Sequence, residues 1–341
     1  MNFQLDVQSL KPLSQNIPSV SPDWSFKDYL GTFKVRWDIG RNNYSVAPGL
    51  YKIGNPNSES DVFVSANYKL SFDILRKNLK GLNAWILVID TKGVNVWCAA
   101  GKGTFSTENI IKEVKNTVLD LIVKHRKLII PQLGAPGVAA HVVKEQTGFR
   151  VIYGPVRAKD IKTFIEANYK ATPEMREITF PVWERAKLIP VDFMYGKYKL
   201  IIALALVFVL SGIDKSGILF SKMLSTSLFP IMGIAAAYIA GVVLTPLLLP
   251  IIPFRAFSVK GAILGALTTV ILYLLFPMQM LEILSIGAMS IGVASFVAMN
   301  FTGSSTFTSL SGVKKEMKWC IPFQAAFTLI GCIVFITSKL L

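Results

Sequence analysis

The sequence predicts two unlike parts, an α/β domain with a mostly parallel sheet followed by an all-α transmembrane domain of five helices. The first part alternates short apolar runs with helical patterns and glycine-containing loops, which is the arrangement of an α/β domain. The second part begins at Lys199, where charge becomes rare: only 9 of the 36 basic and 3 of the 21 acidic side chains lie in the last 143 residues. So little charge is typical of a membrane domain.

Four segments follow from this division: 1–45, 46–170, 171–198 and 199–341. The first is polar and rich in proline, so we expect an extended arm that packs on the α/β domain 46–170. Its aromatic residues are Trp24, Phe26, Phe33 and Trp37. The segment 171–198 holds three prolines and several charges, which indicates a linker. Residues 44–57 contain several turn signals and are expected to wrap the edge of the domain.

The α/β domain begins with a strand at 61–66. Residues 68–79 predict a helix, because apolar residues recur there at helical spacing. Residues 84–90 form a continuous apolar run of the kind that is buried on both faces of a parallel sheet. A turn at 91–93 then leads into the stretch Val94–Lys102.

A further helix begins at an N-cap formed by Ser106 and Thr107, and its apolar stripe reaches Ile122. Two more units follow, with strands at 128–130 and 150–153 and helices at 138–146 and 159–168. The repeated order of strand, loop and helix predicts a Rossmann-like fold. The ligand site of such a fold lies at the carboxyl ends of the strands.

Five apolar spans are expected in the second part, each long enough to cross about 30 Å of hydrocarbon at about 1.5 Å per residue. They cover 199–217, 229–252, 260–277, 281–300 and 319–338. Basic residues gather before the first span and in alternate connections, which assigns these segments to the cytoplasmic side. We therefore expect a multi-pass protein of the cytoplasmic membrane, with the α/β domain in the cytoplasm and the C-terminus outside. Every charge can lie at a span end, so anchoring or partner docking is favoured over transport.

The net charge of +15 comes with no nucleic-acid-binding motif, so we expect no nucleic-acid partner. In a membrane protein, an excess of Lys and Arg instead indicates which segments face the cytoplasm, and it attracts anionic lipid. The three cysteines, Cys98, Cys320 and Cys332, form no C-x-x-C pair, which predicts free thiols in a reducing compartment. The first 19 residues lack the pattern of a cleaved signal peptide.

Cys98 lies between an apolar strand and an amphipathic helix, where several chemistries compete. A phosphate-binding P-loop does not fit, because Val96 stands at the first glycine position and Gly103 at the Ser or Thr position. A dinucleotide fingerprint beginning at Gly101 lacks its third glycine.

Other roles of the thiol need partners that the sequence does not place. No pattern brings His125 or His141 to Cys98 as a catalytic base, and one thiol cannot build a zinc or iron–sulfur site. Two interpretations stay open: a small buried hydrophobic residue, or a single axial ligand to a metal that a macrocycle already holds. A helix N-terminus and Lys102 nearby would favour the thiolate that the second role requires.

The run Asn95-Val96-Trp97-Cys98-Ala99-Ala100-Gly101-Lys102 resembles the N-(V/I)-W-C-A-(A/G)-G-K signature of the HgcA family, the corrinoid proteins of microbial mercury methylation, at every position. The resemblance covers the whole chain, since that family joins a corrinoid-binding α/β domain to five transmembrane helices. It implies a corrinoid cofactor, a cobamide or cobalamin, with cobalt. It also implies that these eight residues form a cap under the corrinoid, and that Cys98 is the catalytic residue and the lower axial ligand to cobalt.

The domain also resembles the corrinoid domain of the corrinoid iron–sulfur protein of the acetyl-CoA pathway. The similar stretches are 64–68, 133–137, 147–149 and 154–155. They imply further cofactor-binding residues: Asn67, Gly134, Ala135, Pro136, Gly154 and Pro155. Glycines in such loops let the backbone approach a ligand. This chain lacks cluster-ligating cysteines, so its reductant has to be a separate protein, and it lacks the D-x-H-x-x-G motif of corrinoid proteins that ligate through histidine.

The resemblance implies a corrinoid-dependent methyltransferase of anaerobic metabolism that transfers a methyl group to Hg(II) and forms methylmercury. The expected partners are a methyltransferase that supplies the methyl group and a ferredoxin-like protein with two 4Fe–4S clusters as reductant. Two other functions stay open. One is a membrane-anchored corrinoid methyl carrier of one-carbon metabolism with a different acceptor, and the other is a membrane-anchored binding protein without catalysis. Cys320 and Cys332 are expected to pack within the fifth span, with a relay of mercury as the alternative.

Overall fold

The computed structural model describes residues 17–301 and 310–341. The chain divides into two compact units. The first holds the described residues up to Val35 and Ile39–Ile178, and the second holds Arg36–Asp38 and Thr179–Leu341. The first 16 residues of the predicted arm lie outside the described residues.

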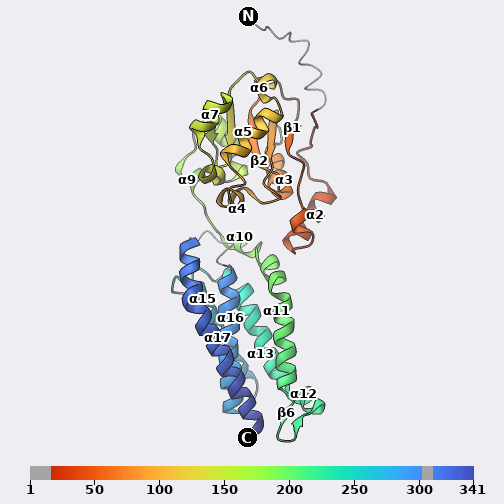
Figure 1. Ribbon diagram of the computed structural model, residues 1–341, viewed down its shortest axis with the longest axis vertical. Helices are drawn as coiled ribbons and strands as arrows, with labels where there is room; N and C mark the ends of the chain where they lie inside the picture. The colour runs from red at the N-terminus through yellow and green to blue at the C-terminus, as the bar shows by residue number, and fades with distance from the viewer. Residues whose placement is uncertain (1–16, 302–309) are drawn as a thin grey trace, which may run out of the picture. The chain divides into compact units, whose positions relative to one another are not determined.

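The first unit is built around a five-stranded sheet with the strand order β1-β3-β2-β4-β5 (Figure 1). The strands are β1 (Gly49–Ile53), β2 (Val62–Ala66), β3 (Ala84–Ile89), β4 (Lys127–Ile130) and β5 (Arg150–Tyr153). Strands β3, β2, β4 and β5 run parallel, whereas β1 pairs antiparallel with β3. The predicted α/β domain with a mostly parallel sheet is confirmed. Residues 44–57, which were expected to wrap the edge of the domain, contribute the edge strand β1, which had not been predicted.

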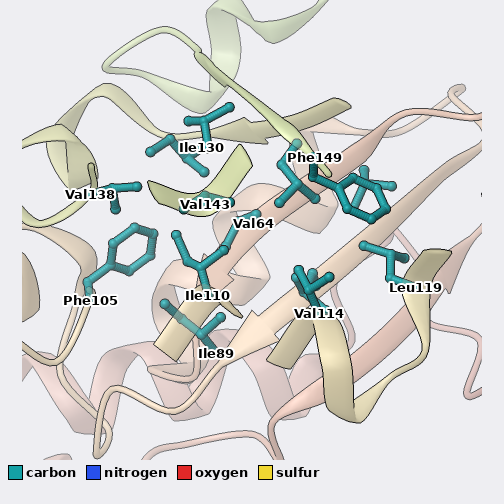
Figure 2. Close-up of a cluster of buried hydrophobic side chains, with 14 of the residues drawn as sticks. Val64, Ile89, Phe105, Ile110, Val114, Leu119, Ile130, Val138, Val143 and Phe149 are labelled. Atoms are coloured by element: carbon teal, nitrogen blue, oxygen red, sulfur yellow. The ribbon is translucent and has the colours of Figure 1, made fainter. Parts of the chain in front are cut away.

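Helices cover both faces of this sheet, because successive strand residues point to opposite sides. One face packs against α4 (Val96–Gly101), α5 (Thr107–Asn116), α6 (Leu119–Ile122) and α7 (Ala140–Thr147). The other packs against α3 (Lys69–Asn78) and α8 (Ile161–Glu166), the latter preceded by the short turn η3 (Ala158–Asp160). In β2, Val62 and Val64 belong to the first core and Phe63 to the second. Figure 2 shows the first core, where Phe105, Ile110 and Val143 gather beside the sheet.

Two local expectations need correction. The helix that was predicted to run from Ser106 to Ile122 is divided into α5 and α6 at Val118, whose φ of 48° lies in the left-handed region that a β-branched residue rarely adopts. The arm is not extended throughout, because Phe26–Arg36 forms helix α2 and Arg41–Asn43 the turn η1. The side chains of Phe26 and Phe33 are exposed instead of packed on the domain.

The second unit is helical. Among the described residues, five helices are long and apolar enough to cross a membrane: Val182–Leu210, Leu228–Leu247, Phe257–Leu275, Met280–Asn300 and Ser311–Leu340. They comprise α10 (Val182–Ala186), α11 (Ile189–Leu210), α13 (Leu228–Ile239), η4 (Ala240–Leu244), α14 (Thr245–Leu247), α15 (Phe257–Leu275), α16 (Met280–Asn300) and α17 (Leu310–Leu340). A small hairpin of β6 (Ile213–Asp214) and β7 (Gly217–Ile218) and helix α12 (Phe220–Thr226) connect α11 to α13.

The first candidate span begins earlier than predicted. Helix α11 starts at Ile189, ten residues before Lys199, and the predicted linker 171–198 also contains α9 (Pro173–Arg176) and α10. Pro190 does not break α11, because it occupies the first turn, where no backbone N–H is needed for the helix.

Small residues bring α15 and α16 close together. Gly261 and Gly265 on α15 face Ala294 and Ser290 on α16. A Cβ atom on Gly265 would lie 2.6 Å from the carbonyl oxygen of Ser290, so there is no room for a side chain. This spacing of small residues is the usual means of close helix packing in membranes.

Candidate functional site

The site predicted from the sequence lies at the carboxyl ends of the parallel strands. Helix α4 contacts both β2 and the 3₁₀ turn η2 (Gln132–Gly137), which follows β4. Strand β2 lies between β3 and β4 in the sheet. The chain therefore passes from β2 to β3 on one side, and then crosses to β4 on the other side of β2. The loops at such a reversal diverge and leave a crevice, which is the usual ligand site of open α/β sheets.

Asn95 holds the start of α4 and the thiol together. Its side-chain oxygen accepts a hydrogen bond from the Cys98 backbone N–H at 3.0 Å, which caps the helix. Its Nδ2 donates to the Cys98 Sγ over 3.5 Å. The Cys98 side chain is exposed, whereas the next two residues, Ala99 and Ala100, are buried in the core. The helix is therefore fixed on its inner side and presents the sulfur on its outer side.

The rest of the motif divides in the same way. Val96 packs partly buried against the core beneath α4. The Trp97 indole is 38% exposed, and both Gly101 and Lys102 are exposed at the C-terminal end of the helix. A Cβ atom on Gly101 would meet nothing within 4 Å, so open space adjoins the helix there. The exposed face of α4 thus carries Trp97, Cys98, Gly101 and Lys102.

The predicted loop residues Gly134, Ala135 and Pro136 lie beside α4 in η2. Gly134 is buried against the Phe105 ring, and Gly137 is packed against the Phe105 carbonyl oxygen, so a Cβ atom at either position would clash. Phe105 is fully buried and was not among the residues predicted from the sequence. The signal for it was present, because two glycines in a loop often mark the close approach of another segment.

Gly154 and Pro155 are buried where β5 ends. The Gly154 N–H donates to the Ile130 carbonyl oxygen at 2.8 Å, and the Gln132 N–H donates to the Pro155 carbonyl oxygen at 3.5 Å. These bonds join the end of β5 to the beginning of η2. Gly154 and Pro155 thus hold η2, the turn that packs on α4, in place.

Asn67 follows β2 and is 6% exposed. Its side-chain oxygen accepts three hydrogen bonds, from the Thr91 N–H at 3.0 Å, the Thr91 hydroxyl at 2.8 Å and the Gly93 N–H at 2.9 Å. Its Nδ2 donates to Asp90 at 3.2 Å. Asn67 therefore holds the turn that leads from β3 into α4, and its carboxamide is hydrogen-bonded within the protein.

The two histidines do not offer a base to the thiol from the contacts that the structure gives them. His125 precedes β4, at the amino end of the sheet, where its ring bonds the Ser60 carbonyl oxygen at 2.8 Å and accepts from the Lys127 N–H at 3.2 Å. His141 is exposed in the first turn of α7. Within residues 17–301 and 310–341, no group of three or more His, Cys, Asp or Glu side chains could hold a metal ion.

The membrane unit contains a cavity of about 900 Å³ between α11, α13, α16 and α17. Most of its walls are apolar, and the polar side chains that line it include Asp192, Lys199, Gln324 and Cys332. Cys332 also donates to the Met289 sulfur at 3.8 Å, and Cys320 accepts from the Ser258 hydroxyl at 3.0 Å. Both thiols thus pack against neighbouring helices.

Comparison with known proteins gives a match in the α/β domain. Residues 37–165 match the CdhD family model, described as CO dehydrogenase/acetyl-CoA synthase delta subunit. The chain is 30% identical over 143 residues to the acetyl-CoA decarbonylase/synthase complex subunit gamma of Archaeoglobus fulgidus, and 32% identical over 145 residues to that of Methanopyrus kandleri. It is 34% identical over 121 residues to the corrinoid/iron-sulfur protein large subunit of Moorella thermoacetica.

These matches are confined to part of each protein. They cover 40%, 42% and 35% of this chain and 30%, 31% and 27% of the three relatives, respectively. The chain therefore spans about three tenths of the length of the curated relatives that it matches. Over residues 37–165 the α/β unit is thus similar to the CdhD family model and to part of a corrinoid/iron-sulfur protein large subunit, and the five candidate spans lie outside the family match.

Proposed function

We propose that this chain is a membrane-anchored corrinoid protein that transfers a methyl group to Hg(II) and forms methylmercury. The observation that carries the proposal is the exposed Cys98 thiol, presented on a short capped helix at the carboxyl ends of the parallel strands. The homology of the α/β unit to a corrinoid/iron-sulfur protein large subunit supports a corrinoid as the ligand. The eight-residue motif around Cys98 supports mercury as the acceptor, through its resemblance to the HgcA family.

The residues present fit a corrinoid. A macrocycle supplies four donors of its own, so the protein has to add only one. Cys98 is such a single donor, because its thiol is exposed. Among the described residues, no group of three or more His, Cys, Asp or Glu side chains could hold a metal ion without a macrocycle. Open space adjoins Gly101 and Gly103, which lets a large flat ligand approach the backbone. When bound, the corrinoid supplies a cobalt centre that carries the methyl group.

Each residue of the site then has a defined task. With a corrinoid bound, the Cys98 sulfur would donate electron density to its metal, and this would favour transfer of the methyl group with its bonding electron pair to an electrophilic acceptor such as Hg(II). Asn95 orients the sulfur through its Nδ2, as a second-shell donor does at metal sites. Trp97 and Lys102 shape the exposed face of the cap, and Ala99 and Ala100 anchor it in the core.

Gly134, Ala135 and Pro136 form the rim beside the cap, because η2 packs directly against α4. Gly154 and Pro155 hold that rim from beneath, and Asn67 holds the turn before the cap. We propose an indirect contribution of these last three residues to cofactor binding, through the position of the loops.

The proposal includes partners and an orientation. A separate methyltransferase delivers the methyl group, and a ferredoxin-like protein with two 4Fe–4S clusters acts as reductant, because the described residues hold no cluster of ligands for such a centre. The candidate spans anchor the protein in the cytoplasmic membrane. The excess of basic residues in alternate connections favours a cytoplasmic α/β domain and an external C-terminus.

A second candidate function is a membrane-anchored corrinoid methyl carrier of one-carbon metabolism with another acceptor. It is favoured by the relatives, which are named as subunits of acetyl-CoA decarbonylase/synthase complexes and as a corrinoid/iron-sulfur protein. The two functions share the cofactor and differ only in the acceptor.

The test begins with anaerobic purification of the full chain and its absorption spectrum. A cobamide spectrum is expected, and a protein that never takes up a cobamide would refute both functions. Methylmercury formation from Hg(II) and a methyl donor is then compared between the native chain, Cys98→Ala and Cys98→His. Loss of activity in both variants, with retained folding, is expected. Undiminished methylmercury production by Cys98→Ala would contradict the axial role, and a loaded protein that methylates another acceptor but not Hg(II) would favour the carrier.

A further inference from the structure

Helix α2 presents an apolar face to the outside of the α/β unit. Phe26, Tyr29, Leu30 and Phe33 follow the spacing i, i+3, i+4 and i+7, so they form one stripe along the helix. Their side chains are 80%, 53%, 39% and 58% exposed, respectively. A continuous aromatic stripe on the surface is unusual for a soluble domain and marks an interaction site.

The opposite face of α2 fixes this orientation. Val35, on this face, is fully buried. Asp28 forms ion pairs with Lys69 at 2.7 Å and with Arg76 at 2.9 Å, both from helix α3 (Figure 1). A Cβ atom on Gly31 would lie 2.5 Å from the Tyr44 hydroxyl, so the helix has no space to rotate. Contacts on the other side of the helix therefore hold the stripe outward, and within it the Tyr29 ring also meets the Trp24 ring edge-on, with their centroids 5.2 Å apart.

The charges on α2 are sorted between the same two faces. Asp28 is its only acidic residue, and it points inward. Burial acts to raise the pKa of Asp28, but hydrogen bonds from Lys69 and Ser25 outweigh it and hold that pKa well below its usual range. Lys27 and Lys34 are exposed and flank the aromatic stripe. The outward part of α2 thus combines aromatic rings with positive charge.

This combination fits the surface of an anionic bilayer. Aromatic side chains prefer the headgroup region, and lysines beside an apolar stripe attract anionic lipids. The chain's own candidate spans bring a bilayer within reach. Only 22 residues separate Glu166, the end of α8, from Ile189, the start of α11, so the connection spans at most about 80 Å even when fully extended.

We infer that the stripe formed by Phe26, Tyr29, Leu30 and Phe33 lies in the headgroup layer of the membrane that the chain's own spans cross, with Lys27 and Lys34 on anionic lipids. The α/β unit then has a second attachment to the membrane besides its connection to α11. This attachment restricts the rotation of the unit relative to the bilayer.

The experiment uses the full chain in nanodiscs of phosphatidylethanolamine and phosphatidylglycerol. In a background with Cys98→Ala, Cys320→Ser and Cys332→Ser, Leu30→Cys is labelled with an environment-sensitive fluorophore. Lys112→Cys, at an exposed position of α5, is the matched control. Nitroxide-bearing lipids then report contact with the bilayer.

We expect blue-shifted emission from the label at position 30 and at least twofold quenching by lipids that carry the nitroxide near the headgroup, with neither effect at position 112. Additional Phe26→Ser and Phe33→Ser substitutions should abolish the quenching. Water-like emission at position 30 would overturn the inference. Blue-shifted emission without lipid quenching would also overturn it, because a protein surface would then cover the stripe.

Discussion

Replacing Asn67 by alanine should loosen the cap helix although Asn67 is not part of it. The change removes one oxygen that accepts from two backbone N–H groups, those of Thr91 and Gly93, and from the Thr91 hydroxyl. The hydroxyl keeps a second partner, because it also donates to the Val94 carbonyl oxygen at 2.7 Å. Two backbone donors are thus left without their acceptor.

The magnitude follows from burial. Thr91 is 0% exposed, so water cannot replace the lost acceptor there, and each buried unpaired group costs about 1–3 kcal/mol. Gly93 is only partly buried, so leaving its N–H unpaired costs an amount near the lower end of this range. We expect a local loss of about 2–4 kcal/mol, which corresponds to roughly 30- to 700-fold faster amide exchange if every 1.4 kcal/mol is tenfold.

The assay is hydrogen–deuterium exchange of the full chain, read by mass spectrometry in peptides that cover residues 90–102. Asn78→Ala is the control, because the bond that its Nδ2 donates to the Ile74 carbonyl oxygen, at 2.8 Å, is exposed and lies within its own helix. Corrinoid content is measured on the same samples. If Asn67→Ala loses the corrinoid while exchange in residues 90–102 stays unchanged, Asn67 contacts the cofactor directly and does not act through the turn at Thr91 and Gly93.

Three further predictions concern other parts of the fold. The pKa of Asp28 is depressed in the folded state, so its contribution to stability is complete above pH about 4 and is lost as the pH falls below that value. Hydrogen exchange of the α2 amides should therefore become faster below pH about 4. In Asp28→Asn this exchange should already be fast and should not change. Burial, and after it the Asp61 carboxylate, raise the pKa of Tyr169 to about 12. The contribution of the Tyr169 hydroxyl to stability is therefore complete below pH about 10 and is lost as the pH rises through 12. Tyr169→Phe should lower the free energy of unfolding by about 1–2 kcal/mol and remove one tyrosine from the ultraviolet titration near pH 12. Gly265→Leu places side-chain atoms against the Ser290 carbonyl oxygen, so thermal scanning in detergent should show a loss of about 1–3 kcal/mol in the membrane unit.

Most of the α/β unit could be predicted from the sequence because its strands are continuous apolar runs. Residues 84–89 and 62–66 are buried along their whole length, and this is the signal that the sequence shows directly. Strand β1 was not predicted because Gly49–Ile53 lies among turn residues. It is the edge strand of the sheet and pairs with β3. Helix α2 was not predicted because its aromatic residues face outward, whereas the interpretation of the arm assumed that aromatic residues are buried.

A helix at α4 could be expected from the sequence, but the contacts that support this helix could not. The motif around Cys98 predicted a cap helix, and the Asn95 cap that begins it is local in sequence. The bonds of Asn67 to Thr91 and the packing of Gly137 on Phe105 join residues that are 24 or more positions apart, so only the folded chain reveals them. The first span was placed too late because a proline and charges are compatible with the first turns of a helix.

The pairing of the strands also sets an order of assembly during synthesis. Strand β3 bonds only to β1 and β2, and both precede it in the chain, so three strands can pair as soon as β3 is made. The cap helix α4 is made next, but η2, on which it packs, is completed only at Gly137. All the segments that build the sheet, α4 and η2 precede Ile189, where α11 begins, so the site can form while the membrane spans are still to be synthesised.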